Sequence, residues 1–318
     1  MRTYIIRRLI YSVIVLIIVT LLVFLAMHLL PGDPILIYVS SGQITQSTPE
    51  AIAELHHEYG LDKPLMVQYF NWIGGIFHGD LGTSISRHMP VTQLIKQKLP
   101  ITLYLSLLAL IISIILGIPA GILSAIRRGT WIDSIVTVIA NAGITIPSFW
   151  LGVILIYIFS LKLHWLPTSG YTSPFVDLGK SMSQAVMPVF CDAIFAISAF
   201  TRQTRSSMLE VMRQDYIRTA WSKGLKERLV ITRHSIKNGL IPVITLIGLS
   251  LSMVVGGSVL IETVFNIPGL GRMLVQAVFS KDYQIVQGFV LIVAVLILLI
   301  NLVVDVSYGW FDPRIRYE

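Results

Sequence analysis

The sequence predicts an all-α, polytopic membrane protein with six transmembrane helices. Of its 318 residues, 54% are hydrophobic and 13% are charged, whereas soluble domains carry about 25% charged residues. Several apolar runs reach the roughly 20 residues that a helix needs to cross a hydrocarbon core about 30 Å thick. Basic residues collect at the ends of these runs, which is typical of loops on the cytoplasmic side of a membrane.

Six segments are long and apolar enough to span: 9–30, 100–126, 133–162, 184–201, 240–264 and 285–309. The fourth is the weakest, because it is short and contains Pro188 and Asp192. The glycines and proline of residues 117–121 predict a kink in the second span, and Pro147 predicts one in the third.

The first apolar segment follows three arginines and so imitates a secretory signal peptide. It is too long for the apolar region of such a peptide, and no small-residue cleavage site follows it. We therefore expect a retained first span.

The distribution of Lys and Arg predicts the orientation. Basic residues are frequent in the N-terminus, the 127–132 loop, the 202–237 loop and the C-terminal tail, which all fall on one side of a six-span arrangement. The loops 31–99, 163–183 and 265–284 have few for their length. We therefore predict that both termini and the 202–237 loop lie in the cytoplasm.

The predicted organisation has four parts. A transmembrane helix (1–30) precedes an extracytoplasmic loop region with short helices (31–99). A core of five transmembrane helices (100–311), which includes the cytoplasmic loop 202–237, precedes a cytoplasmic tail (312–318).

The loop region 31–99 is too long to be a simple connector. Thr48-Pro49-Glu50 predicts a helix start, because it combines an N-cap residue, a proline at the first helical position and an early acid. Apolar residues between Leu65 and Ile76 recur at helical spacing, so a second, amphipathic helix is expected there. Its apolar face could lie along the membrane surface or cap the bundle. Residues 79–82, Gly-Asp-Leu-Gly, should end it.

Signatures of catalysis and of metal binding are missing from the sequence. There is no G-x-x-x-x-G-K-[ST] phosphate loop, no H-E-x-x-H and no Cys/His cluster with zinc spacing. His56 and His57 are consecutive and would point in different directions on a helix. The single cysteine, Cys191, excludes an intramolecular disulfide, and no basic patch has the extent that nucleic-acid binding needs. We expect a chain that is not an enzyme and holds no cofactor or metal.

The polar stretch from Asp215 to Pro242 lies between two apolar runs and is longer than a linker needs to be. Asp215 is placed to cap a short helix over 216–222, and Gly224 to end it at its C-cap. Ala220 keeps one face of this helix small. Three side chains could serve as apolar anchors at an interface: Tyr216, Ile217 and Trp221.

Two interpretations of this stretch are open. It could be a solvated basic loop near anionic lipid headgroups. The combination of the Asp cap, the Ala/Gly core and the aromatic anchors favours a helix that docks onto a partner protein.

The same stretch resembles the cytoplasmic coupling-loop motif of bacterial ABC importer permeases, in which Glu-Ala-Ala, three residues and Gly precede a downstream Pro. Ala220, Gly224 and Pro242 match the second Ala, the Gly and the distal Pro. Arg218 and Thr219 replace the Glu and the first Ala. This departure is typical of the branch that imports di- and oligopeptides or nickel.

Further strings agree with that branch along almost the whole chain. They are LPGDP (30–34), YGLDKPL (59–65), GDLGTS (79–84), ETVFNIPGLGRML (262–274), DYQIVQG (282–288), NLVVDV (301–306) and DPRIR (312–316). An ordered series of this kind is specific, and the chain is identified as a member of this permease family by resemblance.

The resemblance implies a type I ABC importer permease fold in the bacterial inner membrane, with this chain forming half of the translocation pathway by alternating access. It implies as partners a second, homologous permease, two cytoplasmic ATPase subunits that bind ATP and Mg, and an extracytoplasmic substrate-binding protein, beside membrane lipid. The residues expected to couple to the ATPases are Asp215, Tyr216, Ile217, Arg218, Thr219, Ala220, Gly224 and Pro242.

The substrate stays open between peptides, nickel and glutathione, and we favour peptides because no His- or Cys-rich path indicates nickel. Two hypotheses come from other classes. An autonomous channel or secondary transporter would not need the cytosolic docking loop, and a membrane enzyme would need an acid–base or metal constellation.

Polar residues near or within the predicted spans have alternative explanations. Asp192 could line the pathway or contact another subunit, or it could make a buried hydrogen bond. Glu262 could act in a gate or contact an external partner. Asp305 is expected to pair with an arginine, and His28 and Asn141 to serve helix packing.

Overall fold

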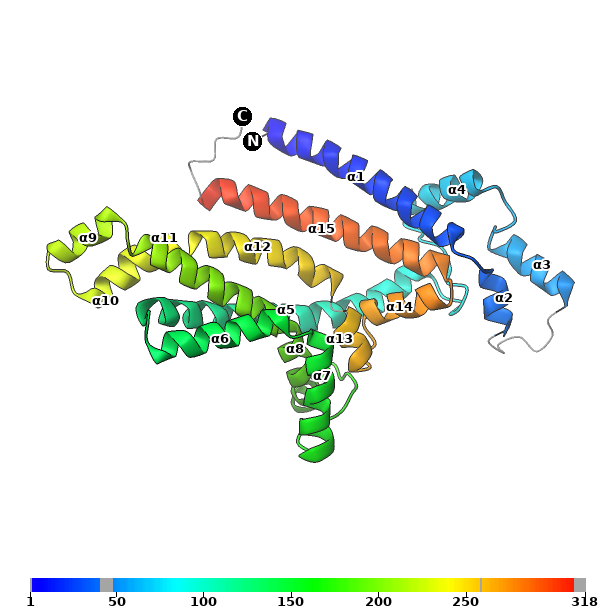
Figure 1. Cartoon of the computed structure of the whole chain (residues 1–318). Helices are drawn as coiled ribbons and strands as arrows, with labels where there is room; N and C mark the ends of the chain where they lie inside the picture. Colours follow the sequence, from blue (N-terminus) through cyan, green and yellow to red (C-terminus); the bar gives the residue numbers. More distant parts are fainter. Residues whose placement is uncertain (1, 41–47, 258, 312–318) are drawn as a thin grey trace. The chain divides into compact units, whose positions relative to one another are not determined.

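The computed structural model describes residues 2–40, 48–257 and 259–311, with side chains from residue 6 to residue 305 (Figure 1). Apart from an isolated bridge between Thr83 and Pro90, the regular structure within these residues is helical. The predicted tail 312–318, with its DPRIR string, lies outside the described residues.

The helices, in chain order, are α1 (Arg2–Leu29), α2 (Pro34–Tyr38), α3 (Pro49–Glu58), α4 (Leu65–Phe77), α5 (Val91–Ile126), α6 (Trp131–Thr145), α7 (Ser148–Leu155), the π-helical η2 (Ile156–Lys162), α8 (Leu178–Val211), α9 (Asp215–Ser222), α10 (Glu227–Leu229), the π-helical η3 (Val230–Ser235), α11 (Ile236–Gly239), α12 (Ile241–Gly256), α13 (Val259–Val264), α14 (Leu270–Phe279) and α15 (Tyr283–Phe311).

Five described helical stretches are long and apolar enough to cross a membrane: Ile6–Leu29, Val91–Ile126, Leu178–Val211, Ile241–Val264 and Tyr283–Asp305. A bent pair, α6 with α7–η2, gives a sixth if it is one span. By length and composition this agrees with the six predicted spans.

Close contacts divide the chain into two compact units. The first unit comprises Met1–Thr102 and Pro268–Glu318, and the second comprises Leu103–Ile267.

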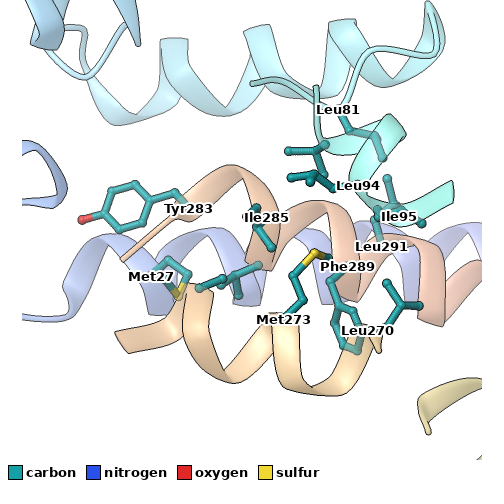
Figure 2. Packing of buried hydrophobic residues seen from close by; sticks show 13 residues of the cluster. Met27, Leu81, Leu94, Ile95, Leu270, Met273, Tyr283, Ile285, Phe289 and Leu291 are labelled. Carbon is teal, nitrogen blue, oxygen red and sulfur yellow. The ribbon is translucent and has the colours of Figure 1, made fainter. Parts of the chain in front are cut away.

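In the first unit, α1 and α15 pack side by side in opposite directions (Figure 1). The Arg8 guanidinium pairs with Asp305 towards one end, and the His28 ring lies 4.6 Å from the Tyr283 ring at the other. The prediction that Asp305 pairs with an arginine is therefore confirmed. Figure 2 shows the core of this unit, in which Met27, Leu94, Met273 and other buried apolar side chains meet.

In the region after α1, α3 begins and α4 ends where the sequence predicts, whereas α2 was not predicted. The Thr48 hydroxyl accepts a hydrogen bond from the Ala51 amide at the start of α3. The second helix forms as α4 and ends before Gly79, which has a positive φ of 77°. A glycine is favoured there because other residues rarely adopt this conformation.

Two consecutive charged residues between α14 and α15 hold these loops in place. The Lys281 ammonium donates hydrogen bonds to the carbonyl oxygens of Leu30, Pro31 and Gly32, the last at 2.9 Å. The Asp282 carboxylate, 1% exposed, accepts from the Ser84 hydroxyl at 2.6 Å. It also accepts from the hydroxyl and the amide of Ser86, at 2.7 and 2.9 Å.

In the second unit, the predicted third span is not one kinked helix. It is broken between α6 and α7, whose axes differ by 103°. Proline disfavours helical backbone at the residue before it, and Ile146, which precedes Pro147, is extended with ψ 124°. The position of the break was predicted, but its size was not.

The second predicted span continues without interruption through residues 117–121 as part of α5. The glycines of this stretch allow α8 to approach closely. A Cβ atom on Gly121 would lie 2.5 Å from the Thr201 carbonyl oxygen, and one on Gly117 would lie 2.8 Å from the Ile197 carbonyl oxygen. From α6, a Cβ atom on Gly143 would lie 2.2 Å from the Ser198 hydroxyl. The three helices therefore form a tightly packed block.

The fourth span, expected to be the weakest, is a continuous helix of 34 residues with Pro188 buried inside it. The sequence prediction was too short because polar residues at both ends of α8 lower the apolar content of the segment. The helix continues beyond the predicted span and ends at Val211.

Candidate functional site

One face of α8 lines two adjoining cavities of the second unit. The first cavity, of about 420 Å³, is mostly apolar and contains Asp192, Phe195 and Ser250 in its wall. The second, of about 1020 Å³, is more polar and contains Asn141, Arg202 and Glu210. Ala199 and Leu246 line both cavities, so the two are neighbours, and together they are called the groove below.

The groove follows helical spacing along α8. Residues three or four apart share a face of a helix, and the lining residues of α8 include Asp192, Phe195, Ala199, Arg202, Ser206 and Glu210. Charged side chains within membrane segments face a protein interior or a water-filled cavity, because exposure to lipid is costly. This face of α8 is therefore suited to a polar path or to a partner subunit.

The two acidic residues singled out in the spans lie in different surroundings. Asp192 is half-buried in the apolar part of the groove wall. Asn141, which is not acidic, lines the more polar part. Glu262 lies in α13 and is 3% exposed. Such burial in this conformation does not fit the predicted contact with an external partner. A role of Glu262 in a gate stays a prediction.

The helix predicted in the 202–237 loop forms as α9, but its start differs from the prediction. Gln214 is the N-cap residue, and no side chain caps the helix. Asp215 is the first helical residue, where an acid is favoured because it faces the positive end of the helix dipole. Its carboxylate lies 3.6 Å from the Arg218 guanidinium. Both side chains are well exposed, so this pair contributes little to stability.

The end of α9 is a Schellman motif. The Gly224 amide donates to the Trp221 carbonyl oxygen at 2.9 Å, and the Leu225 amide donates to the Ala220 carbonyl oxygen at 3.4 Å. Gly224, one position past the C-cap, has a φ of 73°. This left-handed conformation explains why a glycine ends the helix.

The two faces of α9 differ in burial. Ile217 and Ala220 pack against Val230 and the partly buried Val211, and Ile217 is fully buried. The expectation that Ile217 anchors a partner is therefore wrong, because its apolar side chain attaches α9 to its own chain. Tyr216 and Trp221 flank this buried face and are 44% and 41% exposed.

The segment after α9 returns to the same helix. The Asn238 amide donates a hydrogen bond to the Tyr216 hydroxyl at 3.0 Å. Pro242 occupies the first turn of α12, where its missing amide hydrogen is not needed. It is exposed and marks the return of the chain to the apolar segment.

An ion pair between the buried Asp133 of α6 and the half-buried Arg205 of α8 was not predicted from the sequence. The Arg205 guanidinium donates from Nε to Oδ1 of Asp133 at 2.7 Å and from Nη2 to Oδ2 at 2.9 Å. Asp133, 6% exposed, also accepts from the Ser124 hydroxyl at 2.5 Å and the Gly129 amide at 3.0 Å. An acid at the start of an apolar run was the available signal, but its partner lies 72 residues away.

The adjacent histidines bind separate carboxylates in the first unit. His56 lies 3.0 Å from Asp33 and His57 lies 2.7 Å from Asp62. The hydrogen bond with His57 lowers the pKa of the exposed Asp62 carboxyl. In the part of the chain that the structure describes, no three His, Cys, Asp or Glu residues could jointly hold a metal ion.

Residues 117–317 match the family described as the binding-protein-dependent transport system inner membrane component, and residues 1–106 match its N-terminal family. The chain belongs to this permease family. The resemblance noted from the motifs is thus confirmed.

Relatives match this permease over its full length. It is 43% identical to a putative peptide transport system permease protein of Brucella abortus (strain 2308), over all of both chains. Identity is 41% to the oligopeptide transport system permease protein AppB of Bacillus subtilis and 38% to the dipeptide transport system permease protein DppB of Escherichia coli K12, again over all of each chain.

A solved structure shares the fold. A chain of the MetNI methionine ABC transporter, in an inward-facing conformation, matches 69% of this permease and 97% of its own length, with a TM-score of 0.53 and 18% sequence identity. This likeness supports the predicted ABC importer permease fold.

Membership of the family decides several expectations. The permease is a non-catalytic, multi-pass component of the inner membrane, and members of the family bind no cofactor themselves. As a component of a binding-protein-dependent ABC transporter, it works with ATPase and binding-protein partners. An autonomous channel, a secondary transporter and a membrane enzyme are excluded.

Proposed function

We propose that this permease imports di- or oligopeptides as one of two homologous permease subunits. The observation that carries the proposal is identity of about 40% over the whole chain to relatives named as peptide, oligopeptide and dipeptide permeases. Nickel and glutathione are the competing substrates within the same family.

The groove along α8 forms one wall of the translocation path, and a second permease supplies the other wall. The groove is open and carries charged residues on a membrane-spanning helix, which supports a path shared with a partner. Asp192 lies in its apolar part and Arg202 in its polar part. The carboxylate of Asp192 and the guanidinium of Arg202 are complementary in charge to the amino and carboxylate groups of a zwitterionic peptide.

The α9 helix transmits movement from the ATPases to the permease. Its exposed face presents Tyr216, Arg218, Thr219 and Trp221, beside Asp215 at its start. Its buried face joins it to the end of α8 through Ile217 and Ala220. Docking on one face therefore moves the helix that lines the groove.

The orientation that serves this role has both termini and the 202–237 loop in the cytoplasm, as the basic residues predict. The loop region 31–99 then faces the binding protein on the opposite side. Two ATPase subunits bind ATP and Mg, and α9 of each permease docks onto one of them.

Uptake tests the substrate. Labelled dipeptide, nickel and glutathione are supplied separately to a strain that lacks this gene and to the same strain complemented with it. We expect complementation to restore dipeptide uptake. Restoration of nickel or glutathione uptake alone would overturn the peptide assignment and leave the permease role intact.

The coupling role is tested by Ala220→Asp, which places a carboxylate in the buried cluster beneath α9. We expect loss of transport and weaker association with the ATPases, while the protein stays in the membrane. Thr232→Asp, which adds the same charge at an exposed position of η3, serves as the matched control. Uptake at the wild-type level in Ala220→Asp would refute the coupling role.

A further inference from the structure

We propose that the ion pair between the buried Asp133 and the half-buried Arg205 is the rigid joint that makes α6 and α8 move as one body when α9 moves. This inference rests on the proposed coupling role of α9. It assigns to two residues outside the coupling motif the task of transmitting movement from the docking loop to the groove.

The joint lies at the polar part of the groove, whose wall includes Arg205 itself. Arg205 is six residues before the end of α8, and α9 begins at Asp215 after a short turn. α9 is fastened to this end of α8 because Val211 packs against its buried face. A displacement of α9 therefore reaches Arg205, in the polar part of the groove, before it reaches Asp192 in the apolar part.

The geometry of the joint resists both sliding and rotation. The planar guanidinium binds both oxygens of the Asp133 carboxylate, and such a bidentate pair has a defined orientation. The Ser124 hydroxyl bridges the pair, since it donates to Asp133 at 2.5 Å and accepts from Arg205 Nε at 3.1 Å. The end of α5, the start of α6 and α8 thus converge on one carboxylate.

The loop between α5 and α6 is held by the same group. The Gly129 amide donates to Oδ2 of Asp133 at 3.0 Å, where Gly129 has a φ of 76°. A buried carboxylate that loses its cation leaves a charge without compensation, which is strongly unfavourable. The separated state of the two helices is therefore disfavoured.

The helix contacts elsewhere in the block support a joint at this place. Farther along α8, glycines of α5 and α6 touch its backbone so closely that these helices keep their spacing. The contact of α8 with α12 includes apolar side chains such as Phe200 and Val254, and apolar packing does not fix an orientation as a bidentate pair does. Movement is thus expected between α12 and the α5–α6–α8 block, and not within the block.

The test uses the complete importer reconstituted in liposomes, with its partner permease, ATPases and binding protein. Basal ATP hydrolysis, stimulation of hydrolysis by the binding protein, and uptake of labelled dipeptide are measured for each variant. Asp133→Asn keeps the size of the side chain and removes its charge. Ser134→Ala, at the exposed neighbouring position, is the control.

In Asp133→Asn we expect unchanged basal hydrolysis, with stimulation by the binding protein and dipeptide uptake each reduced about fivefold. Arg205→Lys, which keeps the charge and loses the planar fork, should give an intermediate loss. Ser134→Ala should match the wild type.

Wild-type stimulation of ATP hydrolysis by the binding protein in Asp133→Asn would overturn the proposed role of the pair as a joint. A fall of basal hydrolysis, stimulation and uptake in equal proportion would also overturn it, because the pair would then serve folding alone. If Asp133→Asn does not assemble, Arg205→Lys decides by the same two criteria. A wild-type importer that is stimulated but takes up no dipeptide would refute the proposed substrate, and stimulation would still test the joint.

Discussion

The two units of this permease use acidic and basic side chains in different ways. In the second unit, Asp133 and Arg205 bind each other and join two long helices. In the first unit, Lys281 and Asp282 are neighbours in sequence, but each binds a different loop through backbone and hydroxyl groups. A buried charge can therefore either join helices that must move together or hold loops that must keep their shape.

The largest effect is expected at Asp282. Its replacement by Ala leaves the buried donors of Ser84 and Ser86 without their acceptor, so the free energy of unfolding should fall by about 3 kcal/mol. Denaturant unfolding of the purified importer in detergent measures this. Stimulation by the binding protein should stay normal in the molecules that remain folded. A loss of stimulation of ATP hydrolysis in the folded Asp282→Ala molecules would contradict the proposed difference between the two units.

Double-mutant cycles sharpen the comparison. Asp133 and Arg205 share hydrogen bonds, so their cycle should give a coupling energy of about 2 kcal/mol. The Lys281 and Asp282 side chains bind separate segments, and the cycle of Lys281→Met with Asp282→Ala should be additive within about 0.5 kcal/mol. The same unfolding measurement applies to both cycles. Equal coupling energies in the two cycles would contradict the proposed difference between the two units.

The close packing of the α5–α6–α8 block gives a smaller effect. Gly143→Ala brings a methyl group against the Ser198 hydroxyl, and such overpacking should destabilise the protein by about 1.5 kcal/mol. Ser198→Ala removes the clashing atom and should restore most of the loss, because the next contacts lie at 3.2 and 3.3 Å. Failure of this rescue would show that the backbone, and not the hydroxyl, limits the approach.

The smallest effect is expected at the end of α9. Gly224→Ala meets no atom within 4 Å, so only its left-handed conformation is unfavourable, by about 1 kcal/mol. Hydrogen exchange at the last amides of α9 should become faster. Gly224→Asn, which tolerates this conformation better, is the control. Equal hydrogen-exchange rates in Gly224→Ala and the wild type would contradict this prediction, because the turn would then have changed its conformation without loss of stability.

Local signals predicted much of the region 31–99 and of α9. Thr48 and Gly224 act over a few residues, so their roles as cap and terminator follow from sequence spacing. Asp215 shows the limit of such reasoning. The residue before it took the cap position, and a shift of one residue converts a cap into a first-turn acid.

The helical class, the approximate spans, the family and the place of α9 could all be predicted from the sequence, because apolar length and short motifs are local properties. Only the tertiary structure decided that Ile217 is buried, that Arg205 meets Asp133, and that one face of α8 lines a groove. These facts depend on which helices come together over separations of many residues. Composition and the spacing of residues along the chain do not show which helices pack together.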